Sequence, residues 1–173
     1  MRSPIYKSRP IEPNPARFSG GQRINDFIVL CEAFSNSYLL QTDAGNIQVN
    51  AGMGIEAPVI KHNFDEFSGA PLRYLILTQG HVDHVGGVAY FREHNPGLSV
   101  IAQAGNPEHQ AYDGRLAAFR ANRSAFAFTD KFGAAFKDYA QHGLTSFPAQ
   151  DVPLPDILVE DRYQFSLDGL DVE

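Results

Sequence analysis

The chain has 173 residues, 43% of them apolar, which suits one globular domain with a sizeable core. Its formal net charge of −6 and the absence of any dense Lys and Arg run argue against a nucleic-acid partner. No stretch is long and apolar enough to span a membrane, and Met1 to Gly21 lack the apolar core of a secretory signal. The single cysteine, Cys31, cannot form an internal disulfide, so we expect a cytoplasmic protein with no membrane partner.

Proline-rich sequence at the N-terminus predicts an extended arm over residues 1–23 rather than a helix. Such an arm is ordered only where it is tied down. It is therefore either a loose tail or a segment that packs on its own domain or on a partner subunit. We assign residues 24–173 to one domain, with regular structure beginning near Ile24.

Alternating apolar, β-branched and aromatic residues predict an α/β fold for this domain. One helix is expected over 58–67 and a shorter one over 87–94. The strand, helix, strand order around residues 72–102 favours parallel pairing in a layered α/β structure. The expected strands cover residues 27–30, 37–41, 47–50, 72–77 and 98–102.

A long aromatic stretch over residues 107–142 predicts a helical insert, in which Gly133 and the Thr129-Asp130 pair indicate at least one break. It is either a pair of core helices or a lid over an active site. As a lid, it would place Phe126 and Phe132 against an apolar group of a small-molecule substrate. A loop over 147–155 and a hairpin over 163–172 follow.

Two imidazoles, a carboxylate and a carboxamide are concentrated in the segment Thr78 to Gly87, directly after the buried strand over 72–77. In an extended loop alternate side chains point the same way, so Gln79, His81 and Asp83 can converge, while His84 points elsewhere. Histidine and aspartate are good ligands for zinc and related divalent metals. This pattern predicts a hydrolytic metal site. The other histidines are expected at surface or packing positions, namely His62, His94, His109 and His142.

The segment from Thr78 to Gly87 resembles the H-x-H-x-D-H loop of the metallo-β-lactamase superfamily, and residues 36–40 and 50–52 resemble that family's early strands and glycine turn. The resemblance implies an αββα sandwich with two zinc ions at one edge of its two sheets. It implies a metal-bound hydroxide that attacks a lactone, thioester, β-lactam or sulfate ester. Gln79 and His81 would hold one metal, and Asp83 and His84 the other, with Asp83 also orienting the nucleophile.

Three features depart from the family pattern. Gln79 stands where the first histidine is usual, and Asn50 stands where an aspartate is common behind the ligands. The family's remaining ligands lie beyond a segment that resembles residues 167–173. We therefore expect the N-terminal half of the sandwich, completed by a second chain, by another copy, or by a longer polypeptide of which this is a piece. The alternative is a non-catalytic relative, or a fragment that is inactive without its C-terminal half.

Overall fold

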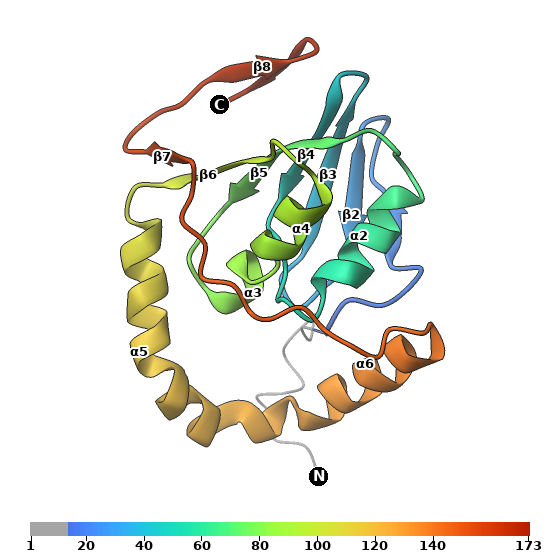
Figure 1. Ribbon diagram of the computed structural model, residues 1–173, viewed down its shortest axis with the longest axis vertical. Coiled ribbons are helices and arrows are strands. Elements are labelled where there is room, and N and C mark those ends of the chain that lie inside the picture. The colour runs from blue at the N-terminus through green and yellow to red at the C-terminus, as the bar shows by residue number, and fades with distance from the viewer. Residues whose placement is uncertain (1–13) are drawn as a thin grey trace, which may run out of the picture.

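The computed structural model describes residues 14–173, and the predicted arm therefore lies outside the described residues over positions 1–13. Nine strands and their helices follow one another as a mixed α/β chain (Figure 1). The strands are β1 (Gly21–Arg23), β2 (Ile28–Cys31), β3 (Ser37–Thr42), β4 (Gly45–Val49), β5 (Leu72–Leu77), β6 (Ser99–Gln103), β7 (Ile157–Val159), β8 (Phe165–Leu167) and β9 (Leu170–Val172). The helices are α2 (Ala57–Asp65), α3 (Val82–Val85), α4 (Val88–His94), α5 (Asn106–Ser124), the 3₁₀ turn η1 (Ala125–Ala127) and α6 (Thr129–Gln141).

Seven strands form one mixed sheet in the order β1-β2-β3-β4-β5-β6-β7. The pairs from β1 to β4 are antiparallel, and those from β4 to β7 are parallel. The predicted parallel pair is confirmed, with Tyr74 opposite Ser99. β1 begins at Gly21, slightly earlier than the predicted start near Ile24. β7 was not predicted, because a three-residue edge strand carries too little pattern to be recognised.

Helices α2, α3 and α4 cover one face of this sheet (Figure 1). The buried residues of α2 include Val59, Ile60 and Phe64, and α4 buries Val88 and Phe91, so both helices turn an apolar stripe toward the core. The sheet face that lies under these helices buries alternate strand residues, such as Leu75 and Val100, in the same core. Across residues 14–173, no helix combines the length and apolar composition that a bilayer-spanning segment needs.

The predicted C-terminal hairpin is confirmed as β8 and β9, which form a separate two-stranded sheet. Its turn residues Asp168 and Gly169 both have positive φ, which aspartate and glycine tolerate better than bulky residues. The Asp168 carboxylate accepts hydrogen bonds from the backbone N–H groups of Asp43 and Ala44. The hairpin is thereby fixed to the β3–β4 turn, and Phe165 lies against Tyr74 with ring centroids 4.5 Å apart.

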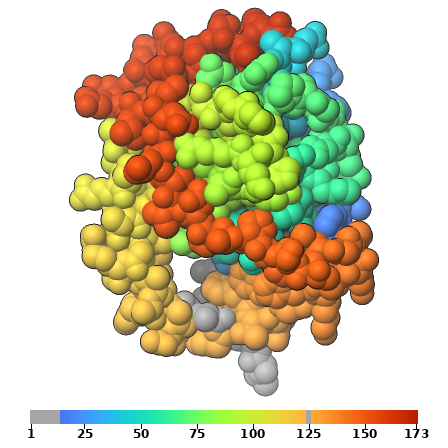
Figure 2. Space-filling view, viewed as in Figure 1, coloured from blue at the N-terminus to red at the C-terminus, as the bar shows by residue number. Residues whose placement is uncertain are grey.

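The aromatic insert forms two helices, and its break lies at η1, next to the predicted Thr129-Asp130 pair. Gly133, the other residue that indicated a break, lies inside α6 and does not interrupt it. The segment after α6 crosses the surface beside α3 and α4 on its way to β7 (Figure 2). It is held there by Gln150, whose amide donates to Val82 O at 2.8 Å, and by Asp151, whose N–H donates to Gly86 O at 3.0 Å.

One buried carboxylate connects three separate loops. Glu56, just before α2, is fully buried and accepts three backbone hydrogen bonds. Its Oε1 accepts from the N–H groups of Ala16 and Phe34, both at 2.9 Å, and its Oε2 accepts from Met53 N–H at 3.0 Å. Burial raises the pKa of Glu56, and the three hydrogen bonds oppose that rise. The end of the arm around Ala16 is therefore packed on the domain, where Tyr139 Oη also donates to Ala16 O.

We expect Glu56→Gln to lower the free energy of unfolding by about 1–3 kcal/mol, because an amide nitrogen cannot accept a backbone N–H and leaves a buried donor unsatisfied. Urea unfolding followed by circular dichroism measures this change. Glu66→Gln is the matched control, because Glu66 is exposed in the same region of the chain, and its effect should stay within about 0.5 kcal/mol. Equal unfolding midpoints for the two variants would contradict the role given to Glu56.

Candidate active site

The predicted ligand loop begins where the central strand β5 ends. Leu77 is the last residue of β5, and α3 starts at Val82, so Thr78 to His81 form a short connection at the carboxyl end of the strand. Because β4, β5 and β6 are parallel neighbours, their carboxyl ends meet at the same edge. Asn50 after β4 and the first turn of α5 after β6 therefore flank this loop.

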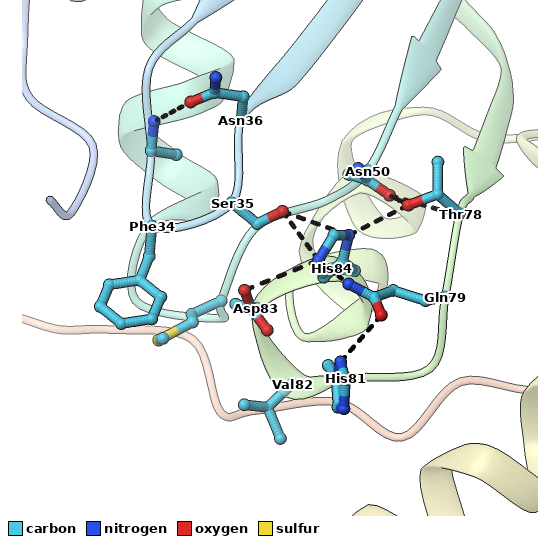
Figure 3. A network of polar contacts seen from close by, with 12 residues as sticks. Phe34, Ser35, Asn36, Asn50, Thr78, Gln79, His81, Val82, Asp83 and His84 are labelled. Atoms are coloured by element: carbon cyan, nitrogen blue, oxygen red, sulfur yellow. Dashed lines mark hydrogen bonds and ion pairs between the residues drawn. The ribbon is translucent and has the colours of Figure 1, made fainter. Parts of the chain in front are cut away.

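The Gln79 carboxamide joins the two histidines of the loop (Figure 3). Its Oε1 lies 2.9 Å from His81 Nδ1, and its Nε2 makes a short contact with His84 Nε2. Asp83 Oδ2 lies 3.7 Å from the same His84 nitrogen. The structure thus brings all four residues of the predicted ligand set into one cluster, with the uncharged amide at its centre.

Two hydroxyls hold His84 from the other side. Ser35 Oγ lies 2.9 Å from His84 Nε2 and 3.2 Å from Nδ1, and Thr78 Oγ1 lies 3.2 Å from Nδ1. Burial lowers the pKa of His84, although the Asp83 carboxylate opposes this effect. A lowered pKa favours the neutral imidazole, which is the form that ligates a metal. Ser35, which the sequence analysis did not single out, is therefore part of the site.

Asn50 supports the loop from the end of β4. Its Oδ1 accepts hydrogen bonds from Thr78 N–H at 3.1 Å and from Thr78 Oγ1 at 2.9 Å. Its backbone has φ of 62°, a left-handed conformation that asparagine tolerates better than most residues. The neutral Asn50 therefore performs a positioning task through its carbonyl oxygen, and this task needs an acceptor but no negative charge.

Helix α5 forms a polar wall beside the loop. His109 Nδ1 accepts the N–H of Gly80 at 3.3 Å, and the His109 ring lies 4.5 Å from the His81 ring. Asp113, one turn further along, is buried and faces His81. The sequence-based assignment of His109 to a surface or packing role was incomplete, because only the fold brings α5 next to residues 80 and 81.

The aromatic residues predicted to contact the substrate lie after α5, in η1 and α6. Phe126 is 78% exposed. Phe132 is half-buried and stacks on Phe34 with ring centroids 5.7 Å apart, and Phe128 contacts the same Phe34 ring at 5.1 Å. Phe34 directly precedes Ser35, which touches His84. The contact of Phe126 and Phe132 with a substrate stays a prediction, and the structure places Phe132 nearer to the loop that carries Ser35.

Comparison with known families decides the assignment. The model of the family described as "Metallo-beta-lactamase superfamily" matches residues 32–171, which is most of the chain. The chain belongs to the metallo-beta-lactamase superfamily. Its matched region includes β3 to β8, the ligand loop and both insert helices, and it ends within β9. This superfamily assignment confirms the resemblance carried by Thr78 to Gly87, and it confirms the α/β fold class.

Relatives within the superfamily are similar over limited spans. A 78-residue segment is 32% identical to the thioesterase pkgB of Emericella nidulans, covering 44% of this chain and 23% of that protein. A 77-residue segment is 32% identical to the lactamase-like protein nscB of Arthroderma gypseum, covering 43% of this chain and 24% of that protein. Both matches support membership of a hydrolase family without specifying a reaction.

Solved structures show the same fold at low identity. A Cronobacter sakazakii metallo-beta-lactamase with a HARLDQ motif superposes with a TM-score of 0.59 at 23% identity, over 92% of this chain and 52% of that one. The sec-alkylsulfatase Pisa1 of a Pseudomonas species superposes with a TM-score of 0.61 at 16% identity, over 88% of this chain and 26% of that one. The chain therefore spans about half the length of the lactamase structure and about a quarter of the sulfatase.

The superfamily is typically zinc-dependent, so the donor set can be tested against zinc. Two imidazoles and one carboxylate are the ligand types that zinc prefers. Among residues 14–173, however, no three His, Cys, Asp or Glu side chains are arranged to hold an ion together. His81 and His84 instead both face the Gln79 amide. The described residues therefore fit zinc in their chemistry, but they supply only part of a coordination shell.

Gly80 offers a test of how closely the loop approaches α5. A Cβ atom built on Gly80 would lie 2.9 Å from Asn106 O, 3.0 Å from Gln110 N and 3.1 Å from His109 Cβ. We expect Gly80→Ala to lower the free energy of unfolding by about 1–3 kcal/mol, because backbone atoms must move to admit the methyl group. Thermal unfolding measures the loss.

Gly69→Ala is the matched control, because a Cβ on Gly69 meets no atom within 4 Å. Its stability should equal or slightly exceed that of the original chain, since alanine restricts the unfolded state. A Gly80→Ala variant as stable as Gly69→Ala would show that the loop does not rest against α5.

Proposed function

We propose that this chain carries part of the active site of a zinc-dependent hydrolase that cleaves an ester-like bond in a small molecule. The observation that carries the proposal is the placement of His81 and His84 on the Gln79 amide, with Asp83 beside His84, at the carboxyl end of β5 in a member of this superfamily (Figure 3). The relatives are named as a thioesterase, a lactamase-like protein and an alkylsulfatase. Because the chain spans about half of a solved lactamase, the activity is proposed for the whole hydrolase.

The residues of the loop would act as metal ligands, and their neighbours would position them. His81 and His84 would hold zinc through neutral imidazoles, and Asp83 would bind metal and orient the attacking water. Bound zinc would supply a water with a pKa near ~7 and polarise the scissile carbonyl or sulfuryl oxygen. Gln79 would be a weak neutral ligand through Oε1, and Ser35, Thr78 and Asn50 would fix the orientation of His84.

Completion of the site requires donors beyond the four in this loop, because a two-metal centre needs more ligands than the loop holds. We propose that they come from a complementing polypeptide, either a C-terminal chain, further sequence of a longer protein, or another copy. The acidic net charge and the absence of a basic run favour a small-molecule substrate over a nucleic-acid partner. We propose a cytoplasmic protein without a membrane partner.

A second candidate function is a non-catalytic binding domain that keeps the superfamily fold. One observation favours it, namely the Gln79 amide that satisfies His81 and His84 at once where the family usually has a histidine. In this alternative the two imidazoles are structural, and zinc is not required for folding or function. Metal content and hydrolysis distinguish the two candidates.

We expect the zinc-loaded protein, with its complementing polypeptide present, to hydrolyse at least one member of a panel of p-nitrophenyl ester, lactone, thioester, β-lactam and alkyl sulfate substrates. Chelation should abolish the activity, and added zinc should restore it. His81→Ala and Asp83→Asn should each lower kcat/KM by about 100-fold or more, because each removes a metal ligand.

His94→Ala is the control for these variants, since His94 lies on α4 and its ring contacts Tyr90 rather than the ligand loop. Its kcat/KM should match that of the original protein. An absence of hydrolysis, together with zinc affinity that is unchanged in His81→Ala, would reject the hydrolase and favour the binding domain.

Variants of the insert test whether Phe126 and Phe132 contact an apolar group of the substrate. We expect Phe132→Ala to raise KM more for substrates with alkyl or aromatic groups than for acetyl esters, because Phe132 stacks on Phe34 next to Ser35. Phe126→Ala tests the other predicted contact in the same assay. Equal KM changes for large and small substrates would show that the insert does not bind the apolar group.

A further inference from the structure

The first two turns of α5 carry side chains that the metal chemistry proposed above does not use. β6 ends at Gln103 and α5 begins at Asn106, so this helix starts at the same sheet edge as the ligand loop. His109 and Asp113 are four residues apart and therefore lie on one face of the helix. Both face the loop, since Gly80 and His81 are their partners.

Asp113 is placed to act on His81. It is 3% exposed, and its Oδ1 lies 3.8 Å from His81 Nε2. The other ring nitrogen, Nδ1, faces Gln79 and the interior of the candidate site. One nitrogen of His81 is thus turned toward a buried carboxylate and the other toward the Gln79 carboxamide.

His109 and Gly80 fix the distance between α5 and the loop. The Gly80 N–H donates to His109 Nδ1, and the edge of one imidazole packs against the other with an interplanar angle of 67°. The missing Cβ at Gly80 is what permits this approach. The contact therefore keeps Asp113 within reach of His81 and restricts the rotation of the His81 ring.

We propose that Asp113, held in place by His109, is a positioning residue that orients His81 toward the candidate metal site. The proposal deepens the hydrolase proposal and rests on it for the metal. A carboxylate beside the non-ligating nitrogen of a histidine fixes the ring and raises its basicity as a ligand. Asp113 would compensate in part for the weak ligand Gln79, because the imidazole of His81 would be better oriented.

A structural explanation competes with this role. Asp113 also forms an ion pair with Arg120, two turns further along α5, and in this explanation it serves only to neutralise that side chain. The two explanations differ in one respect. If Asp113 served only to pair with Arg120, then removing Asp113 and removing Arg120 would have the same effect on His81.

The first experiment measures zinc affinity of the full chain by competition with a chromophoric chelator. Asp113→Asn should lower the affinity about 10- to 100-fold. In a His81→Ala background the same substitution should change it less than threefold, because the partner is gone. Glu108→Gln, which changes an exposed carboxylate in the first turn of the same helix, is the matched control and should leave the affinity unchanged.

Arg120→Met separates the two roles, since Arg120 is half-exposed and its removal leaves Asp113 facing His81. Its zinc affinity should fall less than threefold. A loss as large as that of Asp113→Asn, or additive effects of Asp113→Asn and His81→Ala, would overturn the proposal in favour of the structural ion pair.

If the chain alone binds no zinc because the complementing donors are absent, a metal-free measurement tests the positioning role, whereas the hydrolase proposal is rejected only when the completed protein fails to hydrolyse the substrate panel. In ¹⁵N-histidine-labelled protein, Asp113→Asn should shift the His81 Nε2 resonance and leave the two His84 nitrogens in place. Arg120→Met should leave all three in place. If Asp113→Asn does not fold, His109→Gln should move the same His81 resonance by loosening the helix, and an unmoved resonance would refute the positioning role.

Discussion

The site depends on a carboxylate buried beneath it. Glu56 collects backbone N–H groups from the end of the N-terminal arm, from the β2–β3 loop and from the turn before α2. The β2–β3 loop carries Phe34 and, next to it, Ser35, whose hydroxyl lies against His84. Burying a carboxylate costs free energy unless its oxygens accept hydrogen bonds, and here three backbone N–H groups donate to the oxygens of Glu56. The position of the Ser35 loop, and with it the environment of His84, therefore follows from one polar residue in the core.

The candidate site combines a superfamily ligand loop with neutral substitutes at two positions. Gln79 replaces an imidazole by an amide, which can contact both His81 and His84 because it offers a donor and an acceptor. Asn50 retains the acceptor oxygen that Thr78 needs. The result is a hydrogen-bonded cluster with less negative and less basic character than the family pattern implies. On the opposite side, α5 contributes His109 and the buried Asp113, so the charge near His81 comes from the insert rather than from β4.

Much of the fold was predictable because its signals are local. The apolar run Leu72–Leu77, the β-branched strand over 98–102 and the Asp168-Gly169 turn each define an element through periodicity or φ preference. The break in the insert was harder, since Gly133 is tolerated inside α6 while η1 carries no strong breaker. Ser35, Glu56 and Asp113 were not predictable as members of the site. Their spacing from the loop in sequence carries no information, and only long-range packing brings them to it.

The sequence by itself determined the superfamily and the candidate ligands. A six-residue segment shortly after a buried strand holds Gln79, His81, Asp83 and His84, and these residue types can be recognised without the rest of the chain. The tertiary structure decided how these groups are held and how many donors meet. It turned both imidazoles toward the Gln79 amide, placed Ser35 and Thr78 against His84 with Asn50 supporting Thr78, and placed α5 against Gly80 (Figure 3). Residues distant in sequence become neighbours because parallel strands align their carboxyl ends at one edge, a constraint that no local pattern expresses.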